Sequence, residues 1–65
     1  MKNIIKQKRL DFGFTQDELA ESLGVSRQTI ISLEKEKYNP SIGLAFKISK
    51  VFNSSIEDIF LFEEE

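Results

Sequence analysis

Apolar residues recur at helical spacing through the chain, and short polar breaks divide them into five segments. The first segment carries Ile5, Arg9 and Phe12 on one stripe and is followed by Gly13. Glycine readily takes the left-handed conformation that ends many helices. A helix is therefore predicted from Lys2 to Phe12.

The next two helices are predicted to follow in close succession. Thr15-Gln16-Asp17-Glu18 has the form of a capping box, so the second helix begins near Gln16 and ends at Gly24. Ser26 can cap a third helix over roughly Arg27 to Glu36. The connection between these two helices is therefore a tight turn.

Two further helices complete an all-α prediction. Asn39-Pro40-Ser41 is a breaker followed by a cap, and an amphipathic fourth helix runs from there to Phe52. Ser55 can cap a short fifth helix. No segment alternates long enough for a substantial strand, although Phe60 to Glu63 could add a short one, paired with Lys2 to Ile4.

Composition narrows the class of protein. The chain has 65 residues, 40% of them apolar, a formal charge of −2 and neither Cys nor His, which fits one small domain over residues 1–65. Without Cys, His, a glycine-rich phosphate loop or paired carboxylates, an enzyme, a metal site and a cofactor are not expected. Neither a signal peptide nor a membrane span fits, so a cytoplasmic location is expected.

Charge is distributed unevenly along the chain. Residues 1–50 hold all nine Lys and Arg against six acids, whereas residues 51–65 hold five acids and no cation. A basic region with an acidic tail favours a polyanionic partner. A mixed-charge surface exposed to solvent would give the same pattern.

Residues 16–35 form the most specific motif in the chain. Apolar residues line both helices, Ala20 is small where two helices would cross closely, and Gly24 lies in the turn. Polar and capping residues fall at matching positions. The full pattern is Thr15, Gln16, Leu19, Ala20, Leu23, Gly24, Val25, Ser26, Arg27, Gln28, Thr29 and Ile30, then Leu33, Glu34 and Asn39-Pro40-Ser41.

This pattern resembles the phage repressor and Cro type of helix-turn-helix protein, often called XRE-type, from about Ile5 to Phe60. The resemblance implies a lambda repressor-like bundle of five helices that binds operator DNA as a homodimer. Some proteins of this type serve instead as antitoxins or modulators that bind other proteins. Gly43 departs from the pattern, because a better helix former is usual at that position.

The third helix supplies the candidate base-reading residues. With Ile30 and Leu33 facing the core, its opposite face carries polar groups, and Arg can pair with guanine while Gln pairs with adenine. Ile31 on this face fits either a thymine methyl contact or an incidental surface position. The predicted base-reading residues are Arg27, Gln28, Ile31 and Ser32.

A second group of residues is expected at DNA phosphates. The polar loop after the third helix suits the duplex backbone. The resemblance implies the same role for Gln16, and Thr29 suits packing and DNA contact equally. The predicted phosphate residues are Gln16, Thr29, Lys35, Lys37, Tyr38 and Asn39.

Two structural roles are also predicted. The resemblance implies an ion pair between Arg9 and Glu34 that ties the first helix to the third. The C-terminal segment is rich in apolar side chains, which either form a dimer interface or complete the monomer core. The candidate interface residues are Ile56, Ile59, Phe60, Leu61 and Phe62.

The function predicted from these residues is sequence-specific binding of double-stranded DNA. A homodimer would place two third helices in successive major grooves of an inverted repeat and so act as a repressor. The alternative is a protein-interaction module, such as an antitoxin or anti-repressor partner, on the same fold. The cationic outer face of the third helix favours DNA, and no small-molecule ligand is evident.

Overall fold

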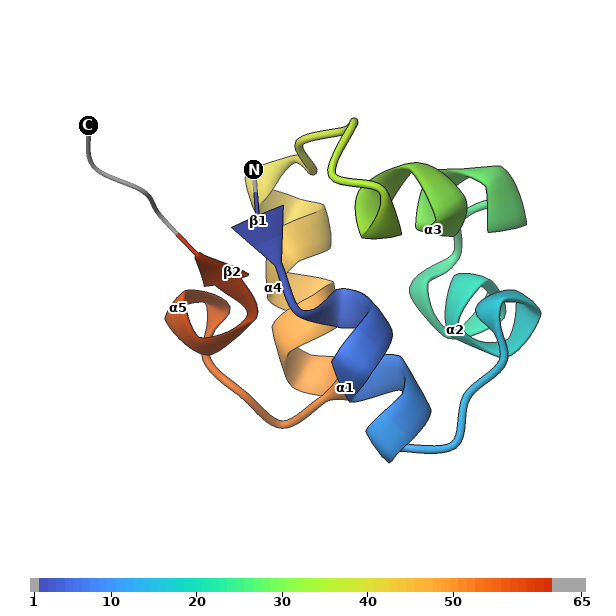
Figure 1. Ribbon diagram of the computed structural model, residues 1–65, viewed down its shortest axis with the longest axis horizontal. Helices are drawn as coiled ribbons and strands as arrows, with labels where there is room; N and C mark the ends of the chain where they lie inside the picture. Colours follow the sequence, from blue (N-terminus) through green and yellow to red (C-terminus); the bar gives the residue numbers. More distant parts are fainter. Residues whose placement is uncertain (1, 62–65) are drawn as a thin grey trace.

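The computed structural model describes residues 2–61, and the five predicted helices are all present there (Figure 1). The first helix begins at Ile5 and not at Lys2 as predicted, because Lys2 and Asn3 form a strand. A two-stranded sheet joins the two ends of this part of the chain. In chain order the elements are β1 (Lys2–Asn3), α1 (Ile5–Asp11), α2 (Gln16–Leu23), α3 (Arg27–Glu34), α4 (Ile42–Val51), α5 (Ile56–Ile59) and β2 (Phe60–Leu61).

Hydroxyl side chains begin four of these helices, as predicted. The hydroxyls of Thr15, Ser26, Ser41 and Ser55 each accept a hydrogen bond from the backbone amide three residues further on. At α2 the capping box is complete, because Glu18 Oε1 also accepts from the Thr15 amide at 2.8 Å. These hydrogen bonds from Thr15 favour the carboxylate and hold the pKa of Glu18 below its ordinary value of 4.5.

A left-handed residue follows the end of each of the first four helices, and one of these residues corrects a predicted boundary. Gly13 and Gly24 have φ values of 76° and 70°, as expected for glycines after a helix. The third helix was predicted to reach Glu36 but ends at Glu34, because Glu36 takes a φ of 63°. The amide of Lys37 then donates to Ser32 O at 3.1 Å, which closes the helix end.

One apolar core lies between the helices. All five helices contribute to it, so each buries one face and exposes the other. The fully buried side chains include Ile5 from α1, Ile48 from α4 and Phe52, which directly follows α4. The core consists of Ile5, Leu19, Ala20, Leu23, Ile30, Leu33, Leu44, Ala45, Ile48, Phe52, Ile59 and Phe60.

The short sheet forms next to two of the predicted dimer-interface residues. β1 pairs antiparallel with β2, with Lys2 opposite Leu61 and Asn3 opposite Phe60, so the strand begins at the predicted residue and uses the predicted partner. Ile59 is fully buried and Phe60 is 2% exposed. Both complete the monomer core, and their assignment to a dimer surface was wrong.

The helices divide the described chain into two ends (Figure 1). α2 and α3 lie at one end, α5 and the sheet lie at the other, and α1 and α4 run between them. The longest dimension is 34 Å, against 22 Å and 20 Å in the other directions. Among the described helices, none has the length and apolar content needed to cross a membrane.

Candidate nucleic-acid interface

α3 presents a polar ridge to solvent. Ser26 begins the helix, and Ile30 and Leu33 turn its inner face into the core. Arg27 and Gln28 are exposed on the opposite face. The first turn of α3 therefore offers a guanidinium and an amide to whatever lies outside it.

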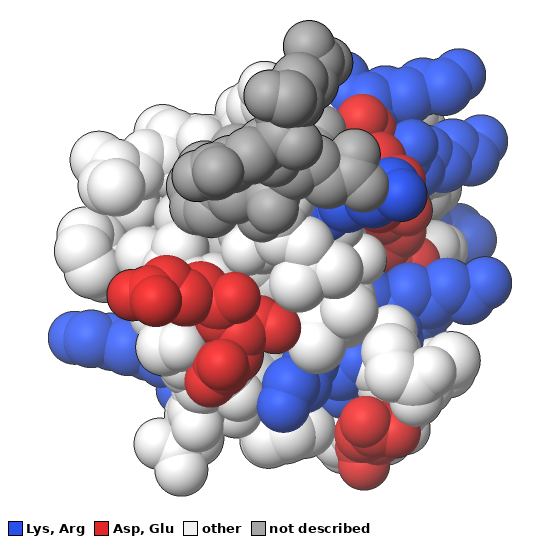
Figure 2. Space-filling model, turned by 60° about the vertical axis from the view of Figure 1, so that its left-hand side comes forward, with Lys and Arg blue, Asp and Glu red and all other residues white. Residues whose placement is uncertain are grey.

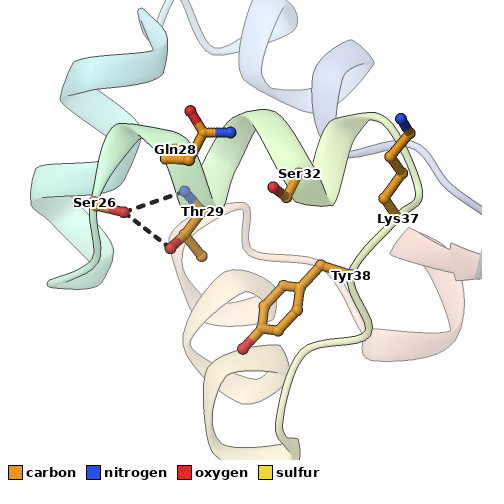
Figure 3. A pocket seen from close by; sticks show the side chains of 6 residues that line it. All are labelled: Ser26, Gln28, Thr29, Ser32, Lys37 and Tyr38. Carbon is orange, nitrogen blue, oxygen red and sulfur yellow. Dashed lines mark hydrogen bonds between the residues drawn. The ribbon is translucent and has the colours of Figure 1, made fainter.

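A shallow hollow of about 320 Å³ lies on one side of this ridge (Figure 3). It brings together predicted base-reading and phosphate-binding residues from α3 and from the loop that follows. The Thr29 hydroxyl is 3.0 Å from that of Ser26, so it takes part in the helix cap. The lining residues are Ser26, Gln28, Thr29, Ser32, Lys37 and Tyr38.

A second hollow, of about 390 Å³, is bordered by Ile31 of α3 and by Lys35, which directly follows that helix. It also contains Lys6 of α1 and Gln16 of α2, and its remaining lining residues are Arg9 and Glu34. Ile31 is half-buried there. Sequence reasoning missed Lys6, although its position three residues before Arg9 on one helix is a usable signal.

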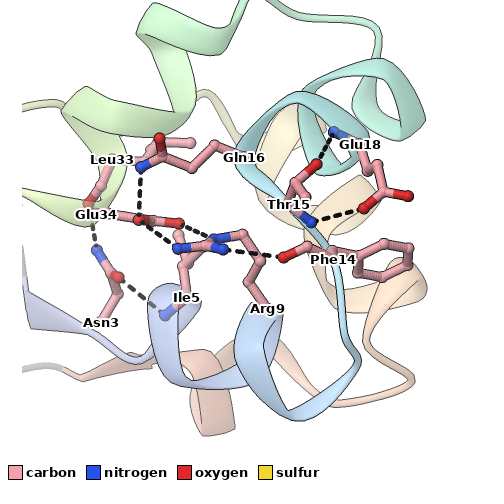
Figure 4. Close-up of polar contacts among 9 residues, drawn as sticks. All are labelled: Asn3, Ile5, Arg9, Phe14, Thr15, Gln16, Glu18, Leu33 and Glu34. Atoms are coloured by element: carbon pink, nitrogen blue, oxygen red, sulfur yellow. Dashed lines mark hydrogen bonds and ion pairs between the residues drawn. The ribbon is translucent and has the colours of Figure 1, made fainter.

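A polar network lies at the bottom of the second hollow (Figure 4). Arg9 Nε donates to Glu34 Oε2 at 2.7 Å, which is the predicted ion pair, and Arg9 Nη1 donates to Phe14 O at 2.9 Å. Gln16 Nε2 donates to Glu34 Oε1 at 3.2 Å. Glu34 therefore connects α1, the start of α2 and the end of α3 through buried or half-buried groups.

Asn3 also ties the end of α3 to the sheet, and sequence reasoning missed it. Its side-chain Nδ2 donates to Leu33 O at 2.9 Å, and its backbone amide donates to Glu36 Oε2 at 3.1 Å. Its Oδ1 accepts from the Ile5 amide at 3.0 Å, where α1 has no hydroxyl cap. A single asparagine therefore stabilises the start of α1 and the end of α3 together.

The remaining predicted phosphate residues lie in the exposed loop after α3. Lys35, Lys37, Tyr38 and Asn39 are all exposed. At the start of α3, Arg27 Nε lies 3.9 Å from Asp17 Oδ1 of α2, and both side chains are mostly exposed. This long, exposed ion pair leaves the guanidinium available to another partner.

The predicted dimer residues are not brought together on one surface. Ile59 and Phe60 are in the core, Ile56 is half-buried against it, and Leu61 is 44% exposed. Phe62 lies outside the described residues. Within residues 2–61, no group of three acidic, His or Cys side chains could hold a metal ion.

Two short helices, α2 and α3, are joined by a tight turn and define a helix-turn-helix fold. The outer face of α3, the second helix of this motif, is polar. A family model described as helix-turn-helix matches residues 5–59. The chain therefore belongs to the helix-turn-helix family, of the XRE type. It is a transcriptional regulator with a DNA-binding fold, and its family is not one of enzymes.

Relatives and solved structures agree with this assignment. An uncharacterized HTH-type transcriptional regulator of Archaeoglobus fulgidus is 58% identical over the whole chain and 92% of its own length. One from Methanocaldococcus jannaschii is 57% identical over the whole chain and 98% of its own length. The N-terminal DNA-binding domain of SinR from Bacillus subtilis superposes with a TM-score of 0.78 at 35% identity, covering 94% of this chain and 90% of that domain.

Proposed function

We propose that this protein is a transcriptional repressor that binds an inverted-repeat operator in double-stranded DNA as a homodimer. The observation that supports this most directly is the ridge of α3 with a cation-bearing hollow on each side. A recognition helix in the major groove has base edges in front of it and a phosphate backbone on either side. Residues 1–65 act as one DNA-binding domain, in the cytoplasm where the operator lies.

The ridge supplies the base contacts in this proposal. Arg27 pairs with guanine, Gln28 pairs with adenine, and Ser32 bonds either kind of edge. Ile31, half-buried at the flank, packs against a thymine methyl. The N-terminal residues of a recognition helix usually contact the bases, which fits the position of Arg27 and Gln28 in the first turn of α3.

The two hollows supply the phosphate contacts. Lys37 and Tyr38 serve one backbone strand, together with Asn39 and the Thr29 hydroxyl beside them. Gln16 and Lys35 serve the other, and we add Lys6 because it lines the same hollow. Glu34 holds the Gln16 amide in place by accepting a hydrogen bond from it. Such contacts set affinity and register without reading sequence.

A dimer gives the selectivity that one recognition helix lacks. Two α3 helices related by a two-fold axis and about 34–36 Å apart would read successive major grooves. Repression then follows when the bound dimer covers a promoter. The alternative, a protein-interaction module, has less support. SinR has been solved in a SinR/SinI complex, but the matched region covers 52% of that SinR chain.

Selection of bound sequences from random duplex DNA tests the proposal, followed by mobility shift at several salt concentrations. We expect an inverted repeat, and an affinity that falls steeply with salt because bound phosphates release counterions. Lys37→Ala and Lys6→Ala should each lower the salt slope by about 1. Lys8→Ala is the matched control, because Lys8 lines neither hollow. Binding that is absent at low salt, or indifferent to salt, would contradict the proposal.

A further inference from the structure

The outer face of α4 is apolar in the first half of the helix, where a solvent-facing helix is usually polar. Ile42 is 73% exposed and Phe46 is 54% exposed. The two lie one helical turn apart, so their side chains are neighbours on the same face. Ile42 is the most exposed large apolar residue in the described chain. We call Ile42, Gly43 and Phe46 the α4 patch.

Gly43 within this patch has no role inside the protomer. Its φ is not positive, and a Cβ added there would meet no atom within 4 Å. Neither backbone conformation nor internal packing therefore requires glycine, which destabilises a helix relative to alanine. Beside the patch's two large side chains, the missing side chain leaves a notch that a second helix can approach closely.

We infer that a second copy of this chain occupies the α4 patch, with α4 packed antiparallel against α4 across a two-fold axis. A two-fold contact uses the same surface on both copies, so each residue pair occurs twice. Placing Phe46 of one protomer over Gly43 of the other satisfies this rule, because the reciprocal pair forms at the same time. This inference rests on the homodimer proposed above and names its surface.

Charges further along α4 and on α5 fit a contact of this side of the molecule with itself. Lys47 and Lys50 are exposed on α4, and Glu57 and Asp58 are exposed on the adjacent α5. Lys50 and Asp58 border one hollow between the two helices. A surface that carries both signs can attract its own copy, whereas a purely cationic surface would repel it.

The proposed dimer contact and the hollows beside α3 involve different residues. Figure 2 brings forward the end of the molecule that carries α5 and the sheet, and shows a broad uncharged area near a group of acidic side chains. No residue that lines the two hollows beside α3 belongs to α4. Contact through the α4 patch therefore does not use the residues that line these hollows.

Sedimentation of the full chain without DNA, over a range of concentrations, tests the inference. The wild type should pass from monomer to dimer as its concentration rises. Phe46→Gln should raise the dimer dissociation constant by about tenfold or more, because it removes a central apolar contact. Leu10→Gln is the matched control, because Leu10 is also 54% exposed but lies on α1. It should change the constant by less than about twofold.

Gly43→Gln should have opposite effects on the stability of the monomer and on the strength of the dimer. It should raise the thermal midpoint of the dilute monomer, since glutamine is the better helix former, and weaken the dimer by about tenfold through bulk at the notch. A wild type that stays monomeric would overturn the inference. So would dimers of Phe46→Gln or Gly43→Gln that are as strong as the wild type.

Binding to a duplex with a single half-site separates this inference from the proposed function. Phe46→Gln should bind the half-site as the wild type does while losing its advantage on the full operator. If all variants bind the half-site but dimerise unchanged, the α4 patch is wrong and the DNA-binding function stands. If the wild type dimerises through the patch but binds no duplex, the inference stands and the proposed function fails.

Discussion

The side chains on the two faces of α3 differ in how strongly they contact the rest of the protein. On the inner face, Ile30 and Leu33 are fully buried, and Glu34 bonds Arg9 and Gln16. On the outer face, Arg27 is exposed and has one carboxylate 3.9 Å away, and Gln28 is exposed at the edge of a hollow. Contacts on the inner face therefore fix the position of the helix, while the side chains on its outer face remain accessible to a partner.

This difference separates stability from recognition. Groups that read the bases should be free of strong internal partners, because every such partner would have to be displaced on binding. The helix that carries them must nevertheless be fixed, since base contacts need a defined position. Inner-face changes should therefore lower the free energy of unfolding, and outer-face changes should lower affinity and selectivity for DNA.

The largest effect should come from Arg9→Met on the inner side. Glu34, whose side chain is 6% exposed, would lose its ion-pair partner, and breaking a buried pair in this way typically costs about 3–5 kcal/mol. A chain of this length has roughly 3–10 kcal/mol of total stability at 0.05–0.15 kcal/mol per residue, so the variant should unfold easily. Urea denaturation followed by circular dichroism measures the change.

The double variant Arg9→Met, Glu34→Met is the control for this prediction. Replacing both charges with apolar side chains of similar length removes the unpaired buried carboxylate, so most of the lost stability should return. A double variant as unstable as Arg9→Met alone would show that the ion pair itself stabilises the fold.

The sequence predicted most of the residues on the inner face of α3, but it predicted less well where the helix ends and which C-terminal residues are buried. Apolar spacing located Ile30 and Leu33, and family resemblance located Arg9 with Glu34. The end of α3 was missed because glutamate rarely adopts the left-handed conformation that Glu36 takes. The sequence left the burial of Ile59 and Phe60 open, because the segment's apolar composition fits a core and an interface equally well.

Long-range polar contacts were the least predictable part of the site. Asn3 bonds Leu33 and Glu36, which lie 30 and 33 residues away, and no local pattern encodes such pairs. Lys6 joins Gln16 and Lys35 only once α1, α2 and α3 have packed. By contrast, every hydroxyl cap was visible in advance, because a cap and its amide lie three residues apart.

An intermediate effect is expected from the outer face. Arg27→Ala and Gln28→Ala should each reduce discrimination between the selected operator and a single-base variant by about 1–3 kcal/mol. The free energy of unfolding should change by less than about 0.5 kcal/mol, because neither side chain packs in the core. Competition mobility shifts and urea denaturation measure the two quantities. Selectivity that survives both substitutions would remove these residues from base reading.

The smallest effect should come from Asp17→Asn at the edge of the outer face. Asp17 lies beside Arg27, and its side chain is 74% exposed, so the pair adds little to stability. Removing its charge frees Arg27 and removes an anion from the proposed phosphate path, so affinity should rise by about twofold for all duplex sequences at low salt. Asp11→Asn removes an equal charge on α1 as the control. If Asp17→Asn instead lowered affinity for the operator alone, Asp17 would be holding Arg27 in its reading position, and the outer face would be more firmly held than its exposure indicates.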